Sequence, residues 1–131
     1  GTGLGWSIKL KNQKNKIVII FFGDGATEEG VFQESIEFAS LHKLKILFVC
    51  ENNFYSVYSS LRNRQSKKRN LLKIAKSTGL RTFYTDGNKA IEIFEKSKKR
   101  EKRVFWFFAK SKNSWNFGAF SSFAPFQFPN L

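Results

Sequence analysis

The sequence is poor in residues that form covalent cross-links or soft metal sites: its 131 residues include one cysteine, one histidine and no methionine. The single Cys50 excludes an internal disulfide and a metal site built from several cysteines. Because Cys50 lies within an apolar run, we expect a buried, unreactive thiol. His42 falls at the end of a predicted helix, which favours helix capping over acid–base catalysis.

Long hydrophobic runs are also missing. No stretch reaches the roughly 20 apolar residues that a membrane-spanning helix needs, and the first residues do not combine a basic segment with an apolar core. We therefore expect no membrane association and an intracellular protein, in the cytoplasm or in the matrix of a mitochondrion or plastid. Because the chain starts at Gly1 and lacks methionine, we expect an internal fragment or a truncated product.

Acidic residues are scarce, with 10 Asp and Glu against 23 Lys and Arg, and the net charge of +13 is unevenly distributed. Residues 1–60 contain six residues of each sign, whereas residues 61–131 contain 17 basic and four acidic ones. Such a basic half could bind nucleic acid through phosphate contacts. The densest run, 96–103, ends a predicted helix, where cations face solvent and oppose the helix dipole. A solvated helix end is therefore favoured, and a basic nucleic-acid-associated domain is the weaker alternative.

Apolar runs alternate with helical periodicity along the chain. Strands are predicted at 16–22, 45–51, 81–85 and 104–109, and helices at 28–42, 70–77 and 90–102. In the first of these helices, Phe32, Ile36 and Ala39 share one face, which we expect to pack on a sheet. Alternating strands and helices indicate an α/β fold with a parallel sheet, helices on both faces and right-handed crossovers.

Two polar motifs each follow a predicted strand. Gly23-Asp24-Gly25 comes after the first strand, and Asn52-Asn53 comes after the second. Parallel strands bind ligands at their carboxyl ends, and Mg²⁺ prefers about six oxygen ligands shared with phosphates and water. Asp24 and Asn53 could supply such oxygens, glycines would let the backbone approach a phosphate, and a helix beginning near Thr27 or Glu28 would point its N–H groups at the anion. The pair predicts a magnesium-held diphosphate.

These motifs carry a family resemblance. The run GDGATEEGVFQESIEFASLHKL, followed by ILFVCENNFYSVYS, closely resembles the alpha subunit of thiamine-diphosphate-dependent dehydrogenases of the pyruvate, branched-chain 2-oxoacid and acetoin dehydrogenase complexes. The resemblance implies a partial thiamine-diphosphate-binding fold over residues 1–115, followed by a Phe-rich tail at 116–131. The opening residues resemble the end of the helix that precedes the family's first strand.

The resemblance implies specific roles. Asp24, Asn53 and the main-chain carbonyl of Tyr55 would bind Mg²⁺, and the group Gly23, Asp24, Gly25, Ala26 and Asn53 would hold thiamine diphosphate. Glu34 matches the position of an acid that lies towards the second active centre of the family's assembly, although an exposed helix glutamate is the simpler interpretation. Basic residues in the segment after Tyr55, Arg62 and Arg64, together with Gln65, would lie near the active site and could meet diphosphate or an acidic carrier domain.

The resemblance also implies partners: a beta subunit, in a heterotetramer, and a lipoyl-bearing acyltransferase core. The expected function is oxidative decarboxylation of a 2-oxo acid with acyl transfer to lipoyl, and this chain would supply only the metal and diphosphate anchor. Lys112 and Asn116 fall near positions where the family has an arginine and a histidine, and Asn116 cannot shuttle a proton at neutral pH. A non-catalytic truncated remnant of the fold is therefore the alternative.

Overall fold

The computed structural model describes residues 1–87, 89, 91 and 103–109. Four parallel strands form one sheet in the order β1-β2-β6-β5, and two short antiparallel strands form a separate hairpin, β3-β4. The elements in chain order are α1 (Thr2–Leu10), β1 (Val18–Gly23), the 3-10 helix η1 (Asp24–Glu28), α2 (Gly30–Leu41), β2 (Ile46–Asn52), β3 (Tyr55–Ser56), β4 (Ser59–Ser60), α3 (Leu61–Arg64), α4 (Leu71–Ser77), β5 (Arg81–Asp86) and β6 (Arg103–Ala109).

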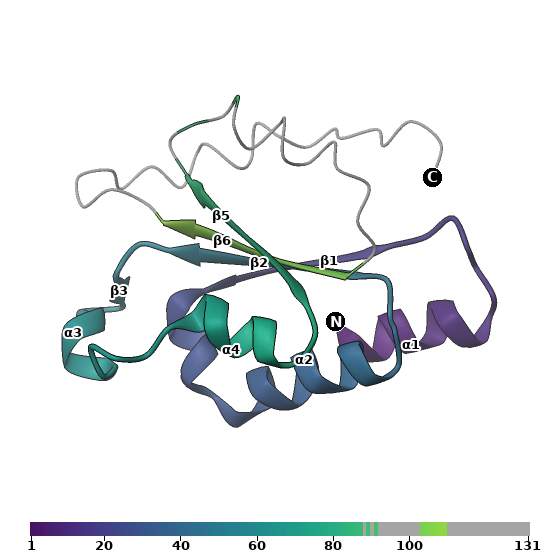
Figure 1. The fold of residues 1–131 in the computed structure, drawn as a ribbon, viewed down its shortest axis with the longest axis horizontal. Coiled ribbons are helices and arrows are strands. Elements are labelled where there is room, and N and C mark those ends of the chain that lie inside the picture. Colours follow the sequence, from purple (N-terminus) through teal and green to yellow (C-terminus); the bar gives the residue numbers. More distant parts are fainter. Residues whose placement is uncertain (88, 90, 92–102, 110–131) are drawn as a thin grey trace.

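The predicted parallel sheet is confirmed, and its four strands lie within two residues of the predicted bounds. Helices α1, α2 and α4 lie on the same side of it (Figure 1). Of the helix predicted at 90–102 the structure describes only Ile91, and Lys112, Asn116 and the tail at 116–131 lie outside the described residues. The helices expected on the second face of the sheet therefore stay a prediction.

The core lies between the sheet and these three helices. Side chains on one face of the sheet pack against the buried face of α2. Phe32, Ile36 and Ala39 on this helix are buried, as predicted. Gly5 brings α1 close to the sheet, since a Cβ there would lie 2.7 Å from Ile46 Cδ1. The remaining buried members of the cluster are Val18, Leu44, Ile46, Phe48, Cys50, Ala75 and Leu80.

His42 follows the last turn of α2, and its ring packs in an aromatic cluster. Its ring centroid lies 4.6 Å from that of Trp6 on α1 and 4.3 Å from that of Phe38. Lys9 Nζ donates a hydrogen bond to the His42 carbonyl at 2.7 Å. His42 thus joins α1 to the end of α2 that precedes β2, whereas the polar motifs follow the carboxyl ends of β1 and β2.

One predicted boundary is wrong, and it matters for the site. The helix expected from about residue 28 is interrupted: Asp24–Glu28 form the 3-10 helix η1, Glu29 is extended at φ −79° and ψ 140°, and α2 begins only at Gly30. Within η1, Thr27 Oγ1 donates to the Asp24 carbonyl at 2.6 Å, which favours the tight turn. The free N–H groups of α2 therefore start six residues after Asp24.

The segment between the strand predicted at 45–51 and the helix predicted at 70–77 contains the β3-β4 hairpin and α3. Phe54 and Val57 adopt positive φ values of 66° and 54° on either side of β3. These conformations reverse the chain, so that residues 59–69 return to the carboxyl ends of β1 and β2. Among the described residues, no helix has the length and apolar character to cross a membrane.

Candidate metal and diphosphate site

The two polar motifs lie at neighbouring strand ends, as predicted. β1 and β2 pair in parallel with Gly23 opposite Glu51, so η1 begins where Asn52 and Asn53 leave β2. This edge is the one at which open parallel sheets bind ligands. The fold therefore brings the Gly-Asp-Gly turn and the Asn-Asn pair to one end of the sheet.

Asp24 is the most buried charged residue of the motif, with 1% of its surface exposed. A carboxylate at such a position requires a compensating positive charge or a full set of hydrogen bonds. Arg64 supplies the charge: its Nη2 lies 2.5 Å from Asp24 Oδ2. The predicted metal ligand thus already holds a cation, the guanidinium of α3.

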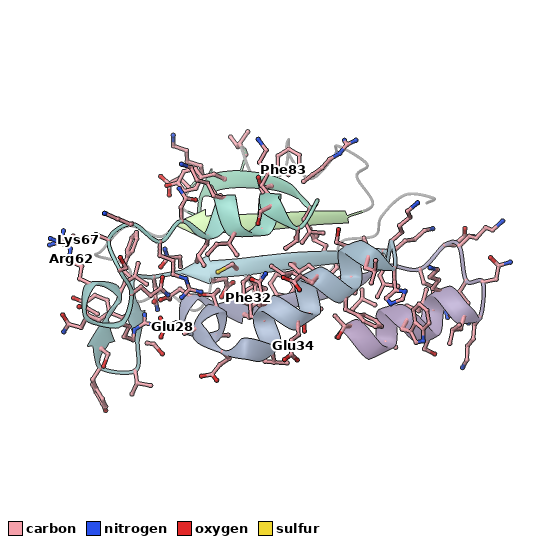
Figure 2. The ribbon with its side chains drawn as sticks, turned by 60° about the horizontal axis from the view of Figure 1, so that its bottom comes forward. Glu28, Phe32, Glu34, Arg62, Lys67 and Phe83 are labelled. Carbon is pink, nitrogen blue, oxygen red and sulfur yellow. The ribbon has the colours of Figure 1, made fainter. Side chains whose placement is uncertain are left out.

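Arg64 contacts a second carboxylate and the hairpin as well. Its Nη1 is ion-paired with Glu28 Oε1, and its Nε donates to the Ser59 carbonyl at 3.3 Å. Figure 2 shows Glu28 on the side of the sheet end where the hairpin and α3 lie. One guanidinium therefore joins both ends of η1 to the segment that follows the hairpin.

Two further side chains attach this segment to η1. Gln65 Nε2 donates to Glu28 Oε1 at 2.7 Å, and Arg69 Nη2 donates to the Thr27 carbonyl. Arg64 and Gln65 therefore lie at the site as expected, whereas Arg62 is exposed and points outwards near Lys67 in Figure 2. Sequence reasoning missed Arg69, whose only signal is its place in a basic run.

The two asparagines shape the chain where it leaves β2. Asn52 is buried and its Oδ1 accepts from Phe54 N at 2.9 Å, while Asn53 is exposed and its Oδ1 accepts from Tyr55 N at 2.9 Å. These side chains form local turns of the type that asparagine favours. An amide oxygen has two lone pairs, so Asn53 Oδ1 keeps one for a further ligand.

Gly25 lies where its turn and the hairpin approach most closely. A Cβ at Gly25 would lie 2.7 Å from Ser56 Oγ and 3.0 Å from Ser56 Cβ, closer than real side chains pack. Gly23 differs, because nothing lies within 4 Å of the corresponding position. Gly25 is therefore required by close packing, while Gly23 and the neighbouring Ala26 are exposed.

Glu34 lies apart from this group. It is exposed on α2 and points away from the sheet, whereas Phe32 points towards it (Figure 2). Neither of the salt bridges found among the described residues involves Glu34. Its predicted role between two active centres stays a prediction.

Cys50 lies next to the site but is chemically quiet. Burial, with smaller contributions from the charges of Asp24 and Glu51, raises the pKa of its thiol to about 12. The predicted burial of the thiol is confirmed, and the raised pKa agrees with low reactivity.

The donor set suits a hard cation. Among the described residues, no group of three His, Cys, Asp or Glu side chains could hold a metal ion, so a metal here would depend on amide and main-chain oxygens beside one carboxylate. Asp24, Asn53 Oδ1 and the Tyr55 carbonyl could supply such a set, and Asp24 already pairs with one cation, the Arg64 guanidinium. These residues therefore fit Mg²⁺, whose preferred ligands are oxygens.

The profile of the family described as "Dehydrogenase E1 component" matches residues 1–105. Over 88 residues the chain is 39% identical to the pyruvate dehydrogenase E1 component subunit alpha type II, mitochondrial, of Ascaris suum, covering 67% of this chain and 19% of that protein. It is 38% identical over 98 residues to the pyruvate dehydrogenase E1 component subunit alpha of Rickettsia typhi, covering 75% and 29%. It is 29% identical over 92 residues to the 2-oxoisovalerate dehydrogenase subunit alpha 1, mitochondrial, of Arabidopsis thaliana, covering 70% and 19%. The chain thus spans less than a third of the length of these relatives.

Solved structures share the fold at low sequence identity. A transketolase from Campylobacter jejuni matches with a TM-score of 0.70 at 19% identity, covering 83% of this chain and 19% of that one. A proposed thiamin diphosphate-dependent enzyme from Mycobacterium smegmatis matches with a TM-score of 0.63 at 20% identity, covering 83% and 20%. The profile match and the 39% identity to an alpha subunit lead to one conclusion: the chain belongs to the dehydrogenase E1 component family.

Proposed function

We propose that this chain is the part of an E1 alpha-type subunit that anchors the magnesium and diphosphate of thiamine diphosphate. The observation that carries the proposal is the buried Asp24 carboxylate at the carboxyl edge of the sheet, beside Asn53 and already paired with a cation. Membership of the E1 family and the names of the relatives support the same cofactor.

Each residue has a part that follows from its chemistry. Asp24 would supply the one charged oxygen, and Asn53 and the Tyr55 carbonyl would supply neutral ones, which leaves positive charge on the metal for a diphosphate. Gly25 and Ala26 would present backbone N–H groups to the diphosphate, because neither residue carries a bulky side chain of its own. When bound, thiamine diphosphate supplies the carbanion chemistry that decarboxylates a 2-oxo acid.

The rest of the function depends on other polypeptide. We infer a beta subunit and a lipoyl-bearing acyltransferase core as partners, because the E1 alpha subunits that the chain resembles belong to dehydrogenase complexes. The relatives are named for pyruvate and for 2-oxoisovalerate, so the proposed substrate class is a 2-oxo acid. The motif resemblance leaves acetoin, a hydroxyketone and not a 2-oxo acid, as an alternative substrate.

Calorimetric titration with thiamine diphosphate in Mg²⁺ buffer, with and without a beta subunit, tests the proposal. Asp24→Ala and Asn53→Ala should each weaken binding at least about tenfold, equivalent to about 1.4 kcal/mol. Asn63→Ala is the matched control, since Asn63 is an exposed asparagine on α3. Binding that both site variants retain, or its absence from the wild-type chain in both settings, would contradict the proposal.

One observation favours a second candidate. The Arg64 guanidinium occupies the Asp24 carboxylate, and a remnant that keeps the fold without binding a cofactor would preserve such an ion pair permanently. The remnant predicts no thiamine diphosphate binding under any of these conditions, so the same titration separates the two candidates.

A further inference from the structure

The Asp24 carboxylate carries one cation in the chain, and a metal there would be another. The Asp24 side chain is 2% exposed and the Arg64 side chain 13% exposed, so the pair is shielded from water. In a shielded environment, two cations on one carboxylate repel each other strongly. Arg64 and a metal ion therefore compete for Asp24.

Arg64 is held in a way that permits exchange. Its two terminal nitrogens contact different carboxylates: Nη2 contacts Asp24 and Nη1 contacts Glu28. The Glu28 side chain is 27% exposed, and so lies nearer to solvent than Asp24. The guanidinium could thus give up Asp24 and remain paired with Glu28.

The backbone around Arg64 offers little resistance to this movement. α3 consists of four residues, none of which is buried. The contacts that attach residues 59–69 to η1 are polar, made by Arg64, Gln65 and Arg69. Displacing the guanidinium therefore breaks hydrogen bonds without opening the hydrophobic core.

We propose that Arg64 is a stand-in for the metal: it neutralises and holds Asp24 while the site is empty, and it yields Asp24 to the metal while keeping its contact with Glu28. This inference rests on the proposed metal site and adds how that site is regulated. The exchange lowers the affinity for metal in the absence of diphosphate, because the metal must first displace the guanidinium.

The test is a titration of the full 131-residue chain with Mn²⁺ alone, in which electron paramagnetic resonance measures the free Mn²⁺. Arg64→Gln should bind Mn²⁺ at least about tenfold more tightly than the wild-type chain, because the competing cation is gone. Arg62→Gln is the matched control, since it removes the same charge from an exposed position on the same helix. It should leave the Mn²⁺ affinity within about twofold of the wild-type value.

A second variant protects the test if Arg64→Gln fails to fold, which circular dichroism would report. Glu28→Gln removes the carboxylate that receives the displaced guanidinium, so Mn²⁺ should bind several-fold more weakly than in the wild-type chain. Glu29→Gln is its control, because it removes the same charge from the next, exposed residue.

The outcomes separate this inference from the proposed function. Equal or weaker Mn²⁺ binding by folded Arg64→Gln, or an equal gain in Arg62→Gln, overturns the exchange. The exchange is also overturned if Glu28→Gln binds Mn²⁺ as tightly as its control, Glu29→Gln. None of these results affects the proposed function, which is judged by the titration with thiamine diphosphate. If no variant binds Mn²⁺ and that titration is also negative, both are overturned.

Discussion

At the scale of single residues, Asp24 is informative because it combines burial with charge. A 1% exposed carboxylate at the end of a strand destabilises the fold unless a cation compensates for it. The chain uses Arg64 for this purpose. Asp24, the residue that would bind the proposed metal, thus forms a structural ion pair with Arg64 when no metal is bound.

Gly25 gives a prediction about the close approach of η1 and β3. Gly25→Ala should destabilise the fold by about 1–3 kcal/mol, because the added methyl group would overlap Ser56. Urea unfolding followed by circular dichroism measures this change. Gly23→Ala is the control, since the space around Gly23 is open. The double variant Gly25→Ala, Ser56→Gly should recover most of the loss, and no recovery would refute the proposed overlap.

Cys50 gives a prediction about pH. The pKa of its thiol is about 12 in the folded chain, against an ordinary value of 9.0. Below pH 9 both states keep the proton, so the thiol adds no pH dependence. Between pH 9 and 12 only the unfolded chain loses the proton, so the folded state should lose up to about 1.4 kcal/mol of stability per pH unit.

The measurement compares urea unfolding of the wild-type chain and of Cys50→Ala across this range. All other ionisable groups are the same in the two proteins, so the difference between the two slopes isolates the thiol. Parallel slopes would count against the burial of this thiol. A second readout is the thiol reagent DTNB at pH 8, which should label the unfolded chain and leave the folded chain unlabelled.

At the scale of elements, α4 is fixed at its start by a side chain. Asn70 Oδ1 accepts a hydrogen bond from Lys73 N at 3.0 Å, which satisfies one of the free N–H groups of the first turn. Asn70→Ala should therefore lower the free energy of unfolding by about 1 kcal/mol. Thermal unfolding measures it, and Asn63→Ala, which lacks such a bond among the described contacts, should change it by less. Equal effects of the two variants would show that the cap contributes nothing.

The strands were predictable because their signal is local. β1 and β2 are continuous apolar runs joined by the α2 crossover, so the position of Asp24 and Asn53 at neighbouring strand ends could be anticipated. The start of α2 could not, because the 3-10 turn depends on the Thr27 hydroxyl and on an extended Glu29. The helical periodicity of apolar residues predicts neither the Thr27 hydrogen bond nor the extended conformation of Glu29.

The structure of residues 55–69, which form part of the candidate site, could largely not be predicted from the sequence. The hairpin and α3 lack apolar periodicity. The turns at Phe54 and Val57 have positive φ values, which these residue types rarely adopt. The Arg64 pair joins positions 40 residues apart, and basic runs are usually solvent-exposed. The family resemblance implied that Arg64 lies near the site, but its ion pair with Asp24 was found only in the structure.

At the scale of the whole molecule, the proposed anchor is one part of the active site that we propose for an E1 assembly. The chain spans 19% to 29% of the length of the three relatives described above. In the proposed assembly the remaining groups of the active site come from other polypeptide. We therefore expect no turnover from the isolated chain, and measurable 2-oxo acid decarboxylation by the purified 131-residue polypeptide would contradict this expectation.

The most direct test of the proposed anchor is the position of a bound metal. Crystals of the chain with thiamine diphosphate and Mn²⁺ in place of Mg²⁺, alone or with a beta subunit, would give an anomalous difference map that locates the ion. The proposed anchor predicts one peak at about 2.1 Å from oxygens of Asp24, Asn53 and the Tyr55 carbonyl. Arg64 should have moved away from Asp24 and should still contact Glu28. A metal peak elsewhere would contradict the anchor, and so would a bound cofactor with no metal beside Asp24 and with Arg64 still paired to Asp24.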